Sequence, residues 1–445
     1  MFRARFLLGA GEVDDDVGAR DAGDDRFYVK SLTLENFRCF ERLELRDLDP
    51  HFNLLVGENG SGKSSVLHAL ACSFQPIANF PVGGAMGPEL YSADVRNLHS
   101  FNISTPPMAT EATVSVSARW FGEDFLRDET VTARGLVESR RASGSPIKIR
   151  EREAQIFPVI AVFTTSRQFL SNFSLIEKTK PQPLNRWKAF QNWSNAGTTS
   201  DELRIWLKDE TLLAFETDRG SMPTALSLVR HACARAIDGA IEVSYMQSRR
   251  DIVVKFEYGP DLAFSTLSDG QRALVGLIAE VARRACVLNF ELLGEKCLTE
   301  TPGLVLIDEI DLHLHPKWQR QIVDALKRIF PKIQFFATTH SPQVIGEARA
   351  EEIVLLTKDG QQKRPPQSYG MDSNWILECV MEAEGRDPAI AKRIKSLFKL
   401  IDDDRFAEAK VEIANLREII DSDPEVVAAE SYIWNLEHAP DEAAE

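Results

Sequence analysis

The stretch FNLLVGENGSGKSSVLHALACSF, residues 52–74, decides how this chain folds. Its opening FNLLV predicts a short buried strand, and its closing SSVLHALACSF predicts a helix. Between them, GENGSGKS at 57–64 matches the pattern GxxxxGK[ST] in full. Glycines at these places let backbone N–H groups turn inward around a phosphate, and the helix N-terminus attracts the same anion. We therefore predict a nucleotide-phosphate loop in an α/β fold.

Two side chains of this loop carry most of its chemistry. Lys63 adds a point charge near the β- and γ-phosphate oxygens, and the Ser64 hydroxyl is placed to bind Mg²⁺. We predict catalytic work for Lys63 and a metal-binding role for Ser64. The residues predicted to bind the nucleotide here are Gly57, Glu58, Asn59, Gly60, Ser61, Gly62, Lys63, Ser64 and Ser65.

A second anion-binding turn, SDGQ at 268–271, opens the apolar segment DGQRALVGLIAEVARRA. Ser268 suits the N-cap of a helix, and Gly270 permits close approach of the backbone. One nucleotide has no obvious use for two such turns in one chain. We predict that Ser268, Gly270 and Gln271 of each chain in a twofold dimer grip the nucleotide held by the other chain. The alternative is an ordinary capped helix.

Acidic and histidine side chains follow two further apolar runs. Asp308 and Glu309 end GLVLI, where one carboxylate can hold Mg²⁺ and the other can deprotonate an attacking water. His340 follows IQFFATT and can stabilise charge on the γ-phosphate in the transition state. We predict Asp308 as a metal ligand, and Glu309 and His340 as catalytic residues. The pair His313 and His315 is weak as a transition-metal site because no third ligand is evident.

Composition limits the class of protein. The 445 residues are 44% hydrophobic and 27% charged, which is ordinary for a globular protein. No apolar run is long enough to span a membrane, and six scattered cysteines suit reduced thiols, so we expect a cytoplasmic protein. The net charge of −15 argues against generic nucleic-acid binding. Local contact with DNA or RNA stays open at the basic clusters Arg140, Arg141, Lys148, Arg150 and Arg152, and Arg249 and Arg250.

The order of patterns along the chain predicts five segments. We expect a disordered tail at 1–26, the first part of a nucleotide-binding head at 27–171, a helical insertion at 172–240, the second part of the head at 241–364 and a helical C-terminal region at 365–445. The aromatic residues of the insertion have near-helical spacing, and we expect core packing rather than base stacking for them. They are Trp187, Phe190, Trp193 and Trp206.

The motifs GENGSGKS, LSDGQR, LIDE and TTHS occur in an order that resembles the head of an ABC-type ATPase. A closer resemblance lies in GLVLIDEIDLHLHPKWQRQIV and FPKIQFFATTHSPQVI, within 303–345. These are similar to the bacterial ABC-type/AAA-type ATP-binding family that includes PtuA, the ATPase of Septu and retron-associated anti-phage defence systems. The resemblance covers most of residues 27–435. It implies an ABC-ATPase-like P-loop head with a mixed sheet and helices, a helical insertion and a C-terminal helical appendage.

The resemblance also implies roles for individual residues. Lys63 and Ser64 become ligands of ATP and Mg²⁺, Asp308 the metal carboxylate and Glu309 the catalytic base. His340 becomes the switch histidine, and Ser268 and Gly270 act on the nucleotide of a second chain. Three departures from the transporter pattern put transporter-like coupling in doubt. Transporter signatures have Gly where this chain has Asp269, and the transporter D-loop has Asp where this chain has His315. Gln168 is only a weak candidate for the Q-loop glutamine.

The function implied is an ATPase whose heads dimerise on ATP, as a homodimer or higher homo-oligomer, and regulate a partner such as an HNH nuclease subunit. A stand-alone ATPase of DNA repair or recombination is the alternative. A nucleotide-binding subunit of a transporter is a third, which the long insertion and the altered signature argue against. No membrane contact is expected.

Overall fold

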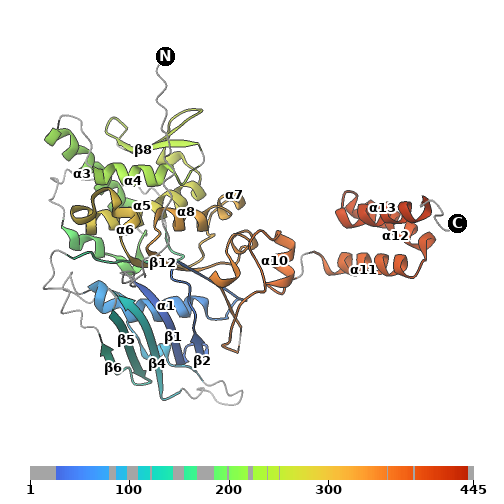
Figure 1. The fold of residues 1–445 in the computed structure, drawn as a ribbon, viewed down its shortest axis with the longest axis horizontal. Coiled ribbons are helices and arrows are strands. Elements are labelled where there is room, and N and C mark those ends of the chain that lie inside the picture. Colours follow the sequence, from blue (N-terminus) through green and yellow to red (C-terminus); the bar gives the residue numbers. More distant parts are fainter. Residues whose placement is uncertain are drawn as a thin grey trace, which may run out of the picture. The chain divides into compact units, whose positions relative to one another are not determined.

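The structure is a computed structural model. It describes residues 27–79, 87–97, 109–120, 123–143, 155–167, 185–197, 200–218, 224–237, 239–249, 251–357, 359–383 and 386–438. The chain divides into two compact units, Met1–Gly370 and Met371–Glu445. Each unit is described by itself, and Figure 1 shows the elements of both. The predicted tail at 1–26 and the start of the predicted insertion, 172–184, lie outside the described residues.

A six-stranded sheet forms the centre of the first unit. Its strand order is β14-β13-β3-β12-β11-β7, with β14 antiparallel and the other five strands parallel. Every residue of β3, β7, β11 and β12 is buried, which explains the continuous apolar runs in the sequence. The strands are β3 (Phe52–Val56), β7 (Val159–Phe163), β11 (Gly303–Ile307), β12 (Ile333–Thr338), β13 (Ile353–Leu356) and β14 (Gln362–Lys363).

A five-stranded antiparallel sheet lies on the other side of helix α1 (Lys63–Asn79) (Figure 1). Helix α1 contacts β4 of this sheet and also β7, β11 and β12 of the central sheet. Its Phe74 ring is fully buried and packs against Phe27 and Phe125. The strand order is β2-β1-β4-β5-β6. The strands are β1 (Tyr28–Phe37), β2 (Phe40–Leu45), β4 (Glu111–Trp120), β5 (Glu123–Thr132) and β6 (Val137–Ser143).

Strands β5 and β6 were not expected from the sequence. Their residues EDFLRDETVT and VESRRAS carry many charges, so apolar residues do not alternate cleanly along them. A separate antiparallel hairpin lies further along the chain, and a third strand joins it. These strands are β8 (Ala240–Met246), β9 (Asp251–Phe256) and β10 (Leu262–Ala263).

Helices of the first unit cover the remaining surface of the central sheet. The longest is α5, which contacts β7, α3 and α4 and is buried along most of its length. The helices are α3 (Ser200–Asp218), α4 (Thr224–Ala234), α5 (Asp269–Leu293), α6 (Cys297–Glu300), α7 (Pro316–Gln319), α8 (Ile322–Ile329) and α9 (Pro342–Ile345). With the phosphate loop between a parallel strand and α1, this architecture confirms the predicted P-loop α/β class.

The aromatic residues of the predicted insertion do not share one α-helix. Trp187 and Phe190 lie in a 3-10 helix at Arg186–Phe190, Trp193 lies in another at Trp193–Asn195, and Trp206 lies in α3. Phe190 and Trp193 are almost fully buried, as core packing requires, and Trp193 Nε1 donates to Asn79 at 2.8 Å. The near-helical spacing was therefore misleading about the secondary structure. It was right about burial at those two positions.

The second unit is helical. Helices α11, α12 and α13 share a core in which Ile394, Leu397 and Leu416 are buried. Phe398, which follows the buried Leu397, is 37% exposed. The helices are α10 (Ser373–Cys379), α11 (Pro388–Asp402), α12 (Phe406–Ile420) and α13 (Pro424–His438). Within the part of the chain that the structure describes, no helix is long and apolar enough to cross a membrane.

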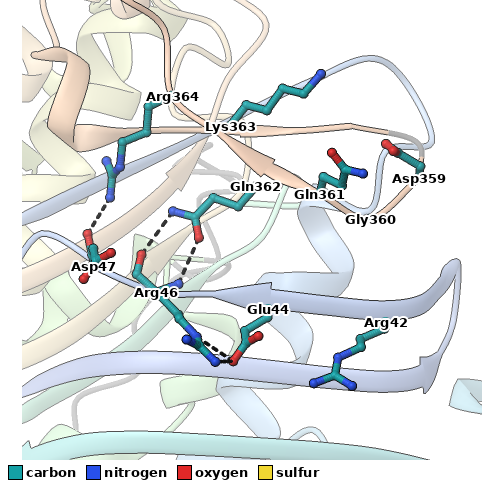
Figure 2. Close-up of a pocket in the computed structure, with 10 residues that line it drawn as sticks. All are labelled: Arg42, Glu44, Arg46, Asp47, Asp359, Gly360, Gln361, Gln362, Lys363 and Arg364. Atoms are coloured by element: carbon teal, nitrogen blue, oxygen red, sulfur yellow. Dashed lines mark hydrogen bonds and ion pairs between the residues drawn. The ribbon is translucent and has the colours of Figure 1, made fainter.

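The two sheets are joined at one edge by Gln362 of β14. Its side chain accepts a hydrogen bond from the backbone amide of Arg46 and donates to the carbonyl of the same residue, just beyond the end of β2 (Figure 2). Gly360 comes so close to the Arg42 carbonyl that a Cβ there would lie 2.5 Å from the oxygen. These contacts line a cleft of about 670 Å³ whose charged side chains have both signs.

Candidate active site

The phosphate loop has a backbone that only glycine adopts freely. Gly60 and Gly62 have φ angles of +82° and +91°. A Cβ on Gly62 would lie 2.2 Å from the ring of Phe40, the first residue of β2. A Cβ on Gly57 would lie 2.5 Å from the Leu356 carbonyl of β13. The loop is therefore held from two sides by the sheets.

Polar groups inside the loop suit a phosphate. Lys63 Nζ donates to the carbonyls of Gly57 and Glu58 at 2.8 and 2.9 Å, which curls the loop around the ammonium. Burial lowers the pKa of this ammonium, while Asp308 and Glu309 act in the opposite direction. Ser61 Oγ is buried and has no hydrogen-bond partner among the described residues. A phosphate oxygen in the loop would accept a hydrogen bond from the Ser61 hydroxyl. The loop therefore fits the phosphate group that the motif predicts.

The two predicted metal ligands meet in the structure. Ser64 Oγ donates to both carboxylate oxygens of Asp308, at 3.0 and 3.1 Å, although 244 residues separate them in sequence. They come from the start of α1 and from the end of β11. Hydroxyl and carboxylate oxygens are the ligands that Mg²⁺ prefers, and it usually keeps several waters besides. The pair can therefore hold Mg²⁺ next to the phosphate loop.

Glu309 follows Asp308 in an uncommon backbone conformation. Its φ is +51°, in the left-handed region that non-glycine residues seldom adopt. The Glu309 amide donates to Thr338 Oγ1 at 2.7 Å, and that hydroxyl donates to Asp308 Oδ1 at 2.7 Å. Thr338 therefore sets the direction of both acidic residues from the neighbouring strand. Strain of this kind is found at functional sites where surrounding contacts hold it in place.

A buried guanidinium also holds the acidic turn. Arg167 is 4% exposed and donates to the backbone carbonyls of Asp308 and Glu309. Burial lowers the pKa of Arg167 to about 10, against the effect of the nearby carboxylates. The side chain is therefore charged at neutral pH. Its location explains how two adjacent acidic residues and a left-handed turn can coexist at a strand end.

Sequence reasoning did not single out Thr338 or Arg167. Thr338 is the first residue of the motif TTHS, and Arg167 immediately precedes Gln168 in TTSRQF. Only the parallel pairing of β7, β11 and β12 brings them to the acidic pair. The signal available in the sequence was the position of each residue just at or after the end of an apolar strand.

The turn at Ser268 caps α5 as expected. Ser268 Oγ accepts from the Gln271 amide at 3.3 Å, and Gln271 Oε1 accepts from the Ser268 amide at 3.1 Å. Ser268 and Asp269 are exposed, whereas Gly270 is buried. A Cβ on Gly270 would lie 2.6 Å from the His313 carbonyl and 3.1 Å from the Trp318 ring. Close approach at Gly270 therefore serves packing inside the chain, a use that the sequence did not suggest.

The remaining predicted positions are only partly described. His340 is exposed and follows β12 at the edge of the sheet where Asp308 ends β11. His315 Nδ1 caps α7 by accepting from the Lys317 amide. Gln168, Lys148, Arg150, Arg152 and Arg250 lie outside the described residues. No cluster of three or more His, Cys, Asp or Glu residues suited to a metal occurs in the described ranges.

A family model described as "AAA domain, putative AbiEii toxin, Type IV TA system" matches residues 52–346, from β3 through α9. This chain belongs to that AAA-domain family. The match includes the phosphate loop, the Ser268 turn, the acidic pair and His340. The AAA-domain core therefore contains all of the predicted site residues.

Relatives of this AAA-domain protein extend beyond the core. "Retron Ec83 probable ATPase" of Escherichia coli is 26% identical over 84% of this chain and 79% of its own length. "Septu protein PtuA" of Bacillus thuringiensis is 23% identical over 84% of this chain and 90% of its own length. Among solved structures, an SMC head bound to the C-terminal winged-helix domain of ScpA has a TM-score of 0.48 and 18% identity, with coverage of 76% and 97%. The resemblance to PtuA-like proteins is confirmed, as is the enzyme class, an ATPase.

The hydroxyl of Thr338 gives a first prediction for this AAA-domain ATPase. Thr338→Val keeps the shape but removes the acceptor of the Glu309 amide, and a buried unpaired donor costs about 1–3 kcal/mol. We expect ATP turnover to fall about tenfold in steady-state assays while ATP affinity stays within about twofold. Thr301→Val is the matched control, because Thr301 is equally buried but accepts from Asn289 instead. Equal turnover in the Thr338 variant and wild type would remove Thr338 from the site.

Proposed function

We propose that this chain is the ATPase of an anti-phage defence system, in which ATP closes a dimer of two heads and this closure regulates a partner effector nuclease. Relatives named as Septu and retron proteins support the setting. The observation that carries the proposal is the contact of Ser64 with Asp308, next to the strained Glu309 turn. This arrangement places a phosphate-binding loop, two ligands for one Mg²⁺ and a candidate base at one edge of the sheet.

The proposed roles follow from position. Lys63 and the amides of Gly60–Ser64 bind the β- and γ-phosphates, and Ser64 with Asp308 holds Mg²⁺. Mg²⁺ bound there supplies neutralisation of phosphate charge. Glu309 takes the proton of the attacking water, and His340 stabilises charge on the γ-phosphate. Arg167 and Thr338 position the acidic pair without touching the substrate.

Dimerisation is proposed from the Ser268 turn. The exposed Ser268 hydroxyl and the N-terminal end of the α5 dipole offer an anion-binding end on the surface of the head. Facing heads related by a twofold axis would place each turn against the other chain's nucleotide. Hydrolysis would then remove the γ-phosphate that bridges the heads and open the dimer. The departure at Asp269 is accommodated because its carboxylate pairs with Arg272 of the same helix.

The partner site is proposed on the second unit. Exposed large apolar side chains gather on its helices, including Trp434, Tyr432 and Val411, which are 59%, 55% and 61% exposed. Apolar and aromatic groups of this kind form the anchors of protein interfaces. An effector such as an HNH nuclease subunit is the partner that the defence setting favours. A partner bound there would contact the second unit, whereas all of the proposed catalytic residues belong to the first.

Trp434 tests this assignment in the full chain. Trp434→Glu should lower recovery of a co-expressed HNH nuclease subunit, the proposed partner, at least tenfold in a tagged pull-down. ATP hydrolysis should stay unchanged, because the substitution lies on α13. Tyr258→Glu is the control, since Tyr258 is 85% exposed but lies in the first unit. Full recovery by the Trp434 variant would move the partner site elsewhere.

Two observations would favour the rival functions instead. ATPase activity stimulated by DNA with no partner present would favour a DNA-repair ATPase. A membrane subunit that co-purifies with this chain would favour a transporter subunit.

A further inference from the structure

A basic cleft of about 490 Å³ lies in the first unit, away from the phosphate loop. Helix α8 forms one wall, and the end of α4, the second turn of α5 and the loop after α9 form the others. Figure 1 locates α4, α5 and α8. The catalytic roles proposed above use none of the residues that line it.

The charge of this cleft is opposite to that of the whole chain. Five cations line it against two carboxylates, while the full sequence has a net charge of −15. The carboxylates Asp324 and Glu347 are already paired, with Arg328 at 3.4 Å and Arg320 at 3.3 Å. The cations are Arg235, Arg320, Lys327, Arg328 and Arg349.

Two of these cations have no carboxylate partner in the described part of the chain. Arg235, beyond the end of α4, and Arg349, beyond the end of α9, are both exposed. Lys327 by contrast pairs with the buried carboxylate of Glu352. Unpaired arginines with five donors each are suited to phosphate, which they bind in a bidentate manner.

An aromatic side chain stands at the cleft as well. Tyr369 lines it and is 67% exposed. The flanking residues hold it there, because Ser368 Oγ donates to the Ala348 carbonyl at 2.7 Å and the Gly370 amide donates to the Gly346 carbonyl at 2.8 Å. Exposed aromatic rings beside basic groups are the elements that bind unpaired bases and their phosphates.

We infer that this cleft binds single-stranded nucleic acid, with phosphates on Arg235 and Arg349 and a base stacked on Tyr369. Its volume is that of a pocket for a ligand of drug size, so it can take one or two nucleotides of a strand and not a duplex. The excess of positive charge is local, as expected for a site that tracks a phosphate backbone. The basic clusters proposed from the sequence are different residues.

Occupation of the cleft would bear on the ATPase elements. Leu274 of the cleft lies on α5, one turn beyond the exposed Ser268 turn, and Glu347 follows His340 by seven residues. A strand bound there would touch the helix that presents Ser268 and the segment that follows the switch histidine. This consequence rests on the proposed function, whereas binding of the strand does not.

The test measures binding of fluorescein-labelled dT15 and U15 to the full-length protein by anisotropy, without nucleotide, from 50 to 300 mM salt. The double variant Arg235→Glu/Arg349→Glu should bind at least tenfold more weakly. Its slope of log affinity against log salt should be shallower by about 1.4, because each phosphate contact of a single strand contributes about 0.7. Tyr369→Ala should lose about tenfold and Tyr369→Phe should retain binding, because the ring is what stacks.

The cleft of Figure 2 supplies the matched control. Arg42→Glu/Lys363→Glu makes the same change of charge at exposed residues of a cleft that also contains Glu44, Asp47 and Asp359. Binding by this control should match wild type, and the thermal midpoints of all variants should agree. Equal loss in both double variants, or no binding by wild type at 50 mM salt, would overturn the assignment. Tighter binding of a poly-glutamate peptide than of dT15, lost in the Arg235/Arg349 variant, would assign the cleft to an acidic protein partner instead.

Discussion

Glu309→Gln should bind ATP as wild type does and hydrolyse it at least ~10²-fold more slowly. Glutamine keeps the size of the side chain and removes its basicity, so the loss should fall on the chemical step. The main-chain contacts of residue 309 with Thr338 and Arg167 involve its amide and carbonyl, and the substitution leaves them intact. Single-turnover hydrolysis measures the rate of the chemical step, and titration with a fluorescent ATP analogue measures the affinity for ATP.

Glu295→Gln is the control for this result. Glu295 is exposed in the 3-10 helix Gly294–Lys296, beyond the end of α5, so the same chemical change should have no effect. A second consequence follows from the dimer. Because the Glu309 variant retains ATP, it should accumulate as closed dimer with Mg²⁺ and ATP, visible by light scattering. Turnover near the wild-type rate would exclude Glu309 as the base.

Ser268→Arg should lower the rate of ATP hydrolysis about 10²-fold. The affinity of a single head for ATP should change little. The new side chain would extend from the exposed cap of α5 toward the place proposed for the other chain's γ-phosphate. Within its own chain it removes the capping bond from the Gln271 amide, a cost of about 1 kcal/mol. Stability alone therefore cannot account for a loss of that size.

The control for this variant is Ser396→Arg, on an exposed face of α11 in the second unit. Hydrolysis should be compared at equal protein concentrations, since dimer formation depends on concentration. The Asp387→Ala variant loses the cap of helix α11, a bond from the Ala389 amide, and should show only the stability cost of a lost cap. If Ser268→Arg reduced hydrolysis no more than Asp387→Ala did, the Ser268 turn would be a helix cap and nothing more.

The sequence predicted the parts of this molecule that obey strong local rules. The phosphate loop follows from eight contiguous residues, and the buried strands β3, β11 and β12 follow from apolar runs that a fully covered parallel sheet requires. Ser268 was recognised as a cap because serine directly before an apolar helical segment suits the N-cap, a local rule that the structure confirms. The acidic pair was recognised because it ends a strand.

Contacts between distant segments were beyond sequence reasoning. Arg167 reaches the carbonyls of residues more than 140 positions away, and its place after an apolar strand does not say which residues it contacts. The packing of Gly270 against His313 and Trp318 depends on how α5 meets the segment that begins α7. The basic cleft is assembled from five separate segments, so its local positive charge is invisible in a linear count that totals −15. Domain boundaries and the roles of the site residues stay predictions.

Mixing two inactive variants tests the composite site most directly. Lys63→Ala removes the ammonium that curls the phosphate loop, and Ser268→Arg blocks the Ser268 turn. A dimer with one chain of each kind has one intact site, formed by Lys63 of one chain and Ser268 of the other. Random 1:1 mixing should therefore recover about a quarter of wild-type hydrolysis, since half of the dimers are mixed and each has one site of two. Two different affinity tags should first show that mixed dimers form. Mixed dimers with no more hydrolysis than either variant alone would contradict a site shared between two chains.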